Sequence, residues 1–212
     1  MEECVLLKTF QSLLTKRLPF KNTRPIIVIT GLPRSGTSML MQMCSAGGVH
    51  ILTDNYRKKD TNNPKGYHEL EKVKKLKEDI SWLPEAKGKA VKIVSPLLMY
   101  LPDSYSYKAI FIQRNLQEVL ASQREMVRRL GTEESPGAND QELEVHYHNH
   151  LNKIYNWLEQ KNNFETIFIR HRDILTDPVQ SSRQIESFLG LDLDAQAMAA
   201  CVDQNLYRKR KG

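Results

Sequence analysis

The hydrophobic and polar positions of this sequence follow two patterns. Short continuous apolar runs rich in β-branched residues predict strands, at residues 26–29, 90–94, 107–113 and 164–169. The segments around them predict helices, at residues 1–16, 37–46, 69–79, 116–130, 140–160 and 178–189. Strands that alternate with helices predict an α/β fold, a mostly parallel sheet of four or five strands with helices on both faces. Ligands of such a sheet bind at the carboxyl ends of its strands.

The length of 212 residues suits one domain and is short for two ordinary ones. We expect residues 1–24 to hold an N-terminal helix, residues 25–190 the α/β core, and residues 191–212 a C-terminal helix and a basic tail. The polar segment DNYRKKDTNNPKG, residues 54–66, is rich in turn formers. It predicts a long exposed loop, which is a common place for functional residues.

The composition is that of a folded protein, with 40% hydrophobic and 26% charged residues. No apolar run has the length of a membrane span, and the first twenty or so residues lack the layout of a signal peptide. We therefore expect a cytoplasmic protein without a membrane partner. Its three cysteines, Cys4, Cys44 and Cys201, lie far apart and suit neither a disulfide framework nor a zinc site.

The formal net charge of +6 suits an anionic ligand, and a solvated basic surface explains it equally well. No signature of a zinc finger or of an RNA-binding module accompanies the charge. We do not expect a nucleic-acid partner, and the sequence is silent on oligomeric state.

The segment GLPRSGTS, residues 31–38, follows the first predicted strand and opens a predicted helix. Backbone N–H groups of a glycine-containing turn, together with a helix N-terminus, form an anion site. In the triphosphate-binding loop G-x-x-x-x-G-K-[ST], a lysine reaches the phosphates. Here Gly31, Gly36 and Ser38 match, but Thr37 stands at the lysine position and the basic residue is Arg34. A guanidinium can bind two oxygens of one anion, which favours a ligand with one phosphate and a small transferable group, without a bridging metal.

A second candidate phosphate element lies where the strand at residues 107–113 ends. Arg114 occupies this junction, and the spacing from Asn115 to Glu118 is that of a capping box, which begins a helix. Ser122 follows on that helix, eight residues after Arg114.

These two elements resemble the sulfotransferases that use 3′-phosphoadenosine 5′-phosphosulfate (PAPS). GLPRSGTS is similar to their 5′-phosphosulfate loop, most closely the P-R-S-G-T form of tyrosylprotein and bacterial members, and Arg114 with Ser122 has the spacing of their 3′-phosphate signature. The resemblance implies a P-loop-like fold, sulfuryl transfer to a hydroxyl or amine, PAPS as donor and no metal. It implies these donor-binding residues: Pro33, Arg34, Ser35, Gly36, Thr37, Ser38, Arg114, Ser122 and, in the basic C-terminal segment, Arg208. Lys92, in VKIVSP, matches a K-[ST]-P segment of some relatives only loosely.

Sulfuryl transfer requires positioning and charge stabilisation, and the acceptor requires a base. We expect Arg34 to act on the leaving oxygen and Glu69 to be the base, because Glu69 follows the long loop and opens a predicted helix. His68 and Asp54 stay open as alternatives. His146, His148 and His150 alternate along a predicted helix, where residues two apart face different directions, so we do not expect a metal cluster.

Two other functions remain open at this point. One is a non-catalytic nucleotide-binding module of the same fold, and the other is a P-loop kinase, which Thr37 disfavours. The acceptor cannot be read from the sequence.

Overall fold

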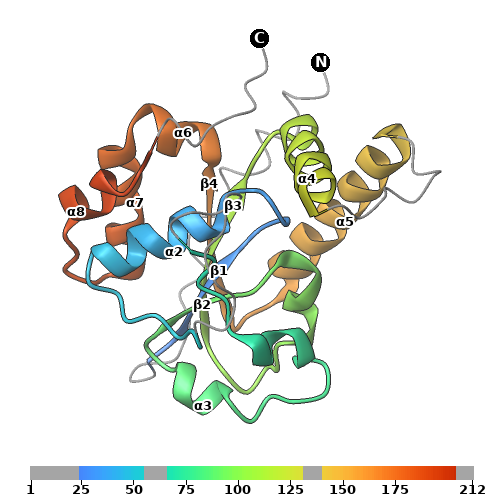
Figure 1. Cartoon of the computed structure of the whole chain (residues 1–212). Helices are drawn as coiled ribbons and strands as arrows, with labels where there is room; N and C mark the ends of the chain where they lie inside the picture. The colour runs from blue at the N-terminus through green and yellow to red at the C-terminus, as the bar shows by residue number, and fades with distance from the viewer. Residues whose placement is uncertain (1–23, 55–65, 131–139, 204–212) are drawn as a thin grey trace.

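The computed structural model describes residues 24–54, 66–130 and 140–203. In this part of the chain, four strands form one sheet in the order β2-β1-β3-β4, and every neighbouring pair is parallel (Figure 1). The strands are β1 (Ile26–Thr30), β2 (Ala90–Lys92), β3 (Tyr107–Gln113) and β4 (Phe164–Arg170). The predicted α/β class and parallel sheet are therefore confirmed.

Strand β1 lies inside the sheet, with β2 on one side and β3 on the other. The chain therefore leaves β1 in one direction to form β2 and returns past it to form β3. The carboxyl ends of β1 and β3 flank the point where the strand order reverses, and such a point opens a crevice for ligands in parallel α/β sheets. The glycine turn follows β1, and Arg114 follows β3.

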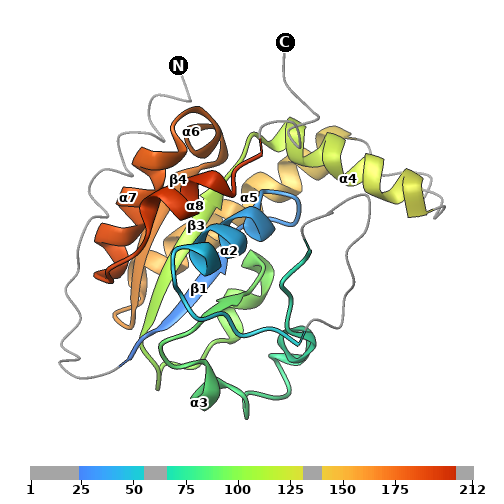
Figure 2. The ribbon, with the colours of Figure 1, turned by 60° about the vertical axis from the view of Figure 1, so that its left-hand side comes forward.

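Helices cover both faces of the sheet, as the two views in Figures 1 and 2 show. One face packs against α2 (Thr37–Ala46), α7 (Pro178–Leu189) and α8 (Ala195–Ala200). The other packs against α3 (Leu83–Ala86), α5 (Asp140–Gln160) and the short helix η3 (Ser95–Tyr100). Helices α4 (Leu116–Leu130) and α6 (His171–Thr176) begin at the carboxyl ends of β3 and β4.

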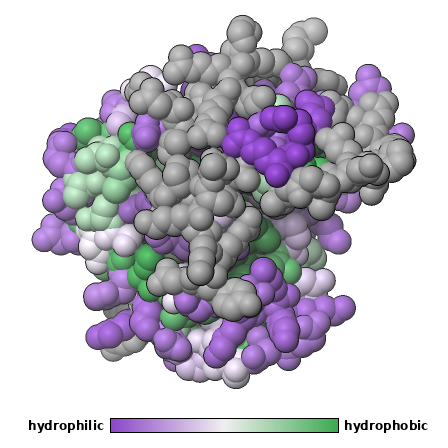
Figure 3. All heavy atoms as spheres, viewed as in Figure 1, coloured by the Kyte–Doolittle hydropathy of each residue, from purple (hydrophilic) through white to green (hydrophobic). Residues whose placement is uncertain are grey.

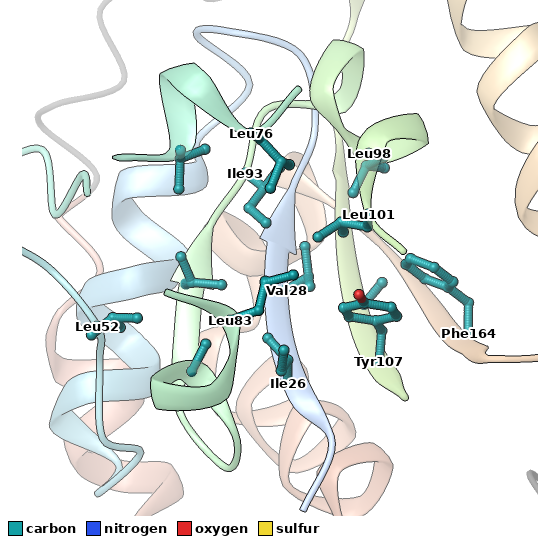
Figure 4. Packing of buried hydrophobic residues seen from close by; sticks show 14 of the residues in the cluster. Ile26, Val28, Leu52, Leu76, Leu83, Ile93, Leu98, Leu101, Tyr107 and Phe164 are labelled. Carbon is teal, nitrogen blue, oxygen red and sulfur yellow. The ribbon is translucent and has the colours of Figure 1, made fainter. Parts of the chain in front are cut away.

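Alternation along β1 divides the core between these two faces, since successive strand side chains point in opposite directions. Ile26 and Val28 join the cluster under α5, while Ile27 and Ile29 join the cluster under α2 and α7. Figure 4 shows Ile26 and Val28 among Leu83, Leu98, Tyr107 and other members of the first cluster. All five β1 residues are buried, which explains the unbroken apolar run.

The surface outside this core is mixed. Hydrophilic residues make up much of the described surface in the view of Figure 3, with smaller apolar areas between them. Of the exposed large apolar residues of the described part, Met99 and Tyr100 are neighbours in η3, while Ile80, Val145 and Leu191 lie in three other segments. Scattered apolar residues of this kind are ordinary on a folded domain.

The helix expected at residues 69–79 is wrong. The structure has instead a 3₁₀ helix, η2 (Glu71–Lys75). Leu70 is still extended, and the buried residues Val73 and Leu76 lie three positions apart, which is the repeat of a 3₁₀ helix. The carboxylate of Asp54 accepts a hydrogen bond from the Glu71 N–H at 2.6 Å and fixes the start of η2.

The other boundaries agree closely with the expectations. Helices α2 and α5 and strand β3 have the expected limits, while β2 ends two residues early. The short helices α3 and α6 were not predicted. The expected N-terminal helix, most of the loop at residues 54–66, and the basic tail lie outside the described residues.

Candidate donor site at the ends of β1 and β3

The glycine turn after β1 is built for a close backbone approach. A Cβ on Gly31 would lie 2.7 Å from the Ile112 carbonyl oxygen and 2.6 Å from Ser35 Oγ. Gly36 has φ +111°, and a Cβ there would lie 2.7 Å from the His171 ring. Helix α2 begins at the next residue, and no side chain among the described residues caps it. Its first N–H groups therefore point to a place where an anion can bind.

The remaining turn residues have different surroundings. Ser35 is buried, and both its backbone N–H and its hydroxyl donate to the Leu32 carbonyl, at 3.1 and 2.7 Å. Ser35 therefore stabilises the shape of the turn. Pro33 is exposed at the tip, Thr37 is buried, and Ser38 is half-buried at the start of α2.

Arg34 joins the turn to helix α4. Its φ of +69° is unusual for a residue with a side chain. Its Nε donates to Ser122 Oγ at 3.1 Å, although 88 residues separate the two. The structure thus brings the basic residue of the turn against the serine of the second element.

Arg114 makes the second link between the two elements. Its Nη1 donates to the Arg34 carbonyl oxygen at 3.0 Å. Its Nε binds Glu118 Oε2 at 3.0 Å, and both side chains are nearly buried, with 10% and 12% exposed. Arg114, Ser122 and Arg34 therefore lie together across the point where the strand order reverses.

The buried side chain of His171 lies beside Gly36 and close to Arg114. It follows β4 directly and packs against Gly36. Burial first, and then the nearby charge of Arg114, lower the pKa of His171 to about 3. The ring is therefore neutral near pH 7, and it adds no charge beside the two arginines.

Lys92 supplies an ammonium group on the other side of the turn. It ends β2 and is almost fully buried. Its Nζ donates to Glu69 Oε1 at 2.9 Å, to Ser38 Oγ at 3.2 Å and to the Tyr67 carbonyl at 3.3 Å. The triphosphate-binding loop carries its lysine within the loop; here the neighbouring strand brings a lysine to the same helix start. The loose match of Lys92 to a K-[ST]-P segment did not predict that its side chain lies at the start of α2.

The three base candidates occupy different places. Glu69 is half-buried and pairs with Lys92, which places its carboxylate beside Ser38. Asp54 is exposed and caps η2. His68 is half-buried with φ +49°. Glu69 is thus the candidate that hydrogen bonds through Lys92 connect to the start of α2.

A further polar pair lies near the turn and was not predicted. Ser95 Oγ and His150 Nε2 are 2.9 Å apart, and the Ser95 N–H donates to the Gly31 carbonyl at 2.9 Å. Burial, followed by nearby positive groups, lowers the pKa of His150. His146 and His148 are exposed. Ser95 and His150 are 55 residues apart in the chain and share no sequence motif, so the sequence alone could not predict their contact.

Two features of the described ranges bear on ligands. No group of three or more histidine, cysteine, aspartate or glutamate side chains in these ranges could hold a metal ion. None of their helices combines the length and apolar character needed to cross a membrane.

Cys44 is buried, and burial raises the pKa of its thiol to about 12. Arg208 lies outside the described residues.

Solved structures with a similar fold include sulfotransferases. Mouse sulfotransferase SULT7A1 complexed with PAP aligns with 91% of this chain and 67% of its own, at a TM-score of 0.55 and 22% identity. Retinol dehydratase in complex with androsterone and inactive cofactor PAP aligns with 85% of this chain and 64% of its own, at 0.50 and 20%. The sulfotransferase domain of the Synechococcus PCC 7002 olefin synthase aligns with 91% and 82%, at 0.51 and 16%.

This chain spans about two thirds of the length of the first two proteins. The comparison with curated proteins gave no match. The model of the sulfotransferase domain matches residues 24–212. This match covers all of the sheet and both candidate phosphate elements, and it confirms the resemblance seen in GLPRSGTS and in Arg114 with Ser122. The chain belongs to the sulfotransferase domain family.

Proposed function

We propose that this chain transfers the sulfuryl group of PAPS to a hydroxyl or amine acceptor. The observation that carries the proposal is the contact between the two phosphate elements, in which Arg34 binds Ser122 and Arg114 binds the backbone of Arg34. One nucleotide with phosphates at both ends of its ribose would bridge such a pair of elements. The mouse sulfotransferase and retinol dehydratase are described with PAP bound, and we extend this ligand class to the present chain.

The turn and the start of α2 form the proposed site of the 5′-phosphosulfate. The α2 N–H groups and the hydroxyls of Thr37 and Ser38 bind the 5′-phosphate, while Pro33, Ser35 and Gly36 shape the turn. Arg114 and Ser122 bind the 3′-phosphate. Arg208 stays a predicted donor contact, and the cytoplasmic location stays a prediction from the sequence.

In the reaction, the acceptor oxygen or nitrogen attacks sulfur in line with the bridging oxygen. The new bond to sulfur forms as the bond from sulfur to the bridging oxygen breaks, and that oxygen leaves on the 5′-phosphate with the negative charge. Arg34 stabilises this charge, as a preorganised cation does for a leaving group. The Lys92 ammonium lies beside the same helix start and can add to this stabilisation.

The acceptor proton passes to a base, for which we propose Glu69. Its carboxylate is paired with Lys92, whose ammonium also binds Ser38 at the start of α2. The same pairing makes a purely structural role for Glu69 the main alternative. Asp54 is the weaker candidate because its carboxylate caps η2.

Calorimetry and a transfer assay test the proposal together. We expect adenosine 3′,5′-bisphosphate to bind without magnesium, and labelled sulfate to pass from PAPS to one of a panel of alcohols, phenols, amines and glycans. Arg34→Ala should keep bisphosphate binding and lose roughly 100- to 1000-fold in turnover. Arg128→Ala is the matched control, because Arg128 is 75% exposed on α4.

Each alternative predicts a different result. A preference for magnesium-ATP over the bisphosphate would favour a P-loop kinase and reject the proposal. Bisphosphate binding without transfer to any acceptor would leave a non-catalytic nucleotide-binding module. If Glu69→Gln keeps full turnover with a confirmed acceptor, Glu69 is not the base, and His150 beside Ser95 becomes the next residue to replace.

A further inference from the structure

Helix α4 holds both arginines of the candidate site from one face. Glu118 and Ser122 are four residues apart, so they lie one helical turn apart on the same side. Glu118 binds Arg114 Nε, and Ser122 accepts from Arg34 Nε. Arg114 also donates to the Arg34 carbonyl. Hydrogen bonds therefore link Glu118 to Arg114, Arg114 to Arg34 and Arg34 to Ser122, and the backbone of α4 joins Ser122 to Glu118.

The contact between Glu118 and Arg114 is more than a surface ion pair. Both side chains are about nine-tenths shielded from solvent, and a charge-assisted hydrogen bond is strongest where water does not compete. The backbone of Glu118 is also fixed, since its N–H and that of Gln117 donate to Asn115 Oδ1 at 3.3 and 3.0 Å. The carboxylate therefore has a defined position from which to orient Arg114.

Arg114, held by Glu118, contacts Arg34, the strained residue of the turn. Arg34 has φ +69°, a conformation that costs a residue with a side chain on the order of 1 kcal/mol. The hydrogen bond from Arg114 Nη1 to the Arg34 carbonyl stabilises this conformation. It thereby supports the conformation in which the Arg34 side chain binds Ser122.

We propose that Glu118 is a positioning residue for sulfuryl transfer, which holds Arg114 against the turn and through it keeps Arg34 in its catalytic conformation. This inference rests on the proposed function and assigns a role that the donor signature does not give to Glu118. A carboxylate bound to Arg114 lowers the positive charge available to a 3′-phosphate. Its contribution is therefore expected in turnover more than in donor affinity.

The kinetic test compares three variants with a confirmed acceptor. Glu118→Ala should lower kcat on the order of 100-fold, because a misplaced catalytic group costs about that much, while the Kd of adenosine 3′,5′-bisphosphate changes less than about threefold. Glu118→Gln keeps an oxygen for Arg114 Nε and should lose roughly tenfold. Glu125→Gln is the matched control, since Glu125 pairs with Arg128 and Arg129 farther along the same helix.

A double-mutant cycle separates positioning from a general structural role. In an Arg34→Ala background, Glu118→Ala should lower kcat by less than about threefold, because residues that act through one another are not additive. Full multiplication of the two losses would overturn the inference. An unchanged kcat, or a loss confined to bisphosphate affinity with adenosine 5′-phosphate binding unaltered, would overturn it too.

A spectroscopic test does not depend on activity. The Nε–H NMR resonance of Arg34, identified by its absence in Arg34→Ala, should shift in Glu118→Ala and stay in place in Glu125→Gln. If it stays in place in both, the inference fails whatever the protein catalyses. If it shifts but the wild-type protein transfers no sulfate, the proposed function fails and the coupling of Glu118 to Arg34 stands.

Discussion

The buried neutral His171 should make the stability of the protein depend on pH below about 6.5. The ring is 7% exposed, packs against Gly36 and lies near Arg114, and its pKa falls from 6.5 to about 3. In the unfolded chain the same ring takes up a proton near pH 6.5. Between about pH 6.5 and 3 the unfolded state therefore binds a proton that the native state does not. Stability rises with pH in this window and is lost as the pH falls.

The size of the effect follows from the two pKa values. A tenfold difference in proton affinity corresponds to about 1.4 kcal/mol. At pH 7 the unfolded ring is largely neutral and the penalty is small, whereas at pH 5 the unfolded ring is almost fully charged and the native ring is not. The free energy of unfolding should therefore decrease by about 2 kcal/mol between pH 7 and pH 5 because of His171 alone.

Urea unfolding at both pH values measures this decrease in the wild type, in His171→Gln and in His148→Gln. The loss should shrink by about 2 kcal/mol in His171→Gln, which has no proton to gain. His148→Gln should behave as the wild type, because His148 is exposed on α5. The comparison uses the pH dependence of each variant, so an overall destabilisation by the substitution does not affect it.

An equal pH dependence in the wild type and His171→Gln would refute the reasoning. If the variant does not fold, the ring resonances of His171 in the wild-type protein give the same answer. They should not shift between pH 8 and pH 5. A titration near pH 6 would show that the ring is not held neutral behind the turn.

Three further substitutions test the packing around the site. Gly36→Ala should destabilise the protein and weaken bisphosphate binding in calorimetry, because a Cβ clashes with the buried ring; Gly48→Ala, with φ +101° and open space around it, should show only the backbone cost of about 1 kcal/mol. Lys92→Met should lower the free energy of urea unfolding by about 3 kcal/mol and reduce turnover, since it removes the buried ammonium that pairs with the partly buried Glu69 carboxylate; an unchanged midpoint would contradict this. Asp177→Ala removes the side-chain cap of α7 and should cost about 1 kcal/mol without altering donor binding.

The sequence predicted the sheet and the turn well because both depend on local patterns. The β-branched run at β1 is buried on both faces, and glycines stand where the turn requires them. The pairing of Arg114 with Ser122 came from a spacing known in one family. These signals are carried by neighbouring residues, so no knowledge of distant contacts was needed.

The contacts between segments were not readable in the same way. Lys92 and Glu69 come together although η2 and α3 lie between them in the chain, and Ser95 and His150 come together although β3 and α4 lie between them. No local pattern specifies either contact. Glu118 was assigned to a capping box on its spacing from Asn115. The structure confirms the cap from Asn115 to the Glu118 N–H, and it shows in addition that the carboxylate binds Arg114.

The short helices show a different limit. Helix α6 begins at His171 directly after β4, with no side-chain cap among the described residues to mark the boundary. Tertiary packing of a buried histidine, rather than helix propensity, fixes this start. The first residue of η2, Glu71, likewise depends on a distant contact, because its N–H donates to Asp54, seventeen positions away in the chain.

Strand β1 is hydrogen-bonded on both sides and carries the turn directly at its end. The amide protons at Ile27 to Thr30 should therefore be among the slowest to exchange with solvent, because they are released only when the sheet separates. The candidate donor-binding turn follows β1 directly at this end. On heating, the protein should consequently lose nucleotide binding at the same temperature at which the whole sheet melts cooperatively.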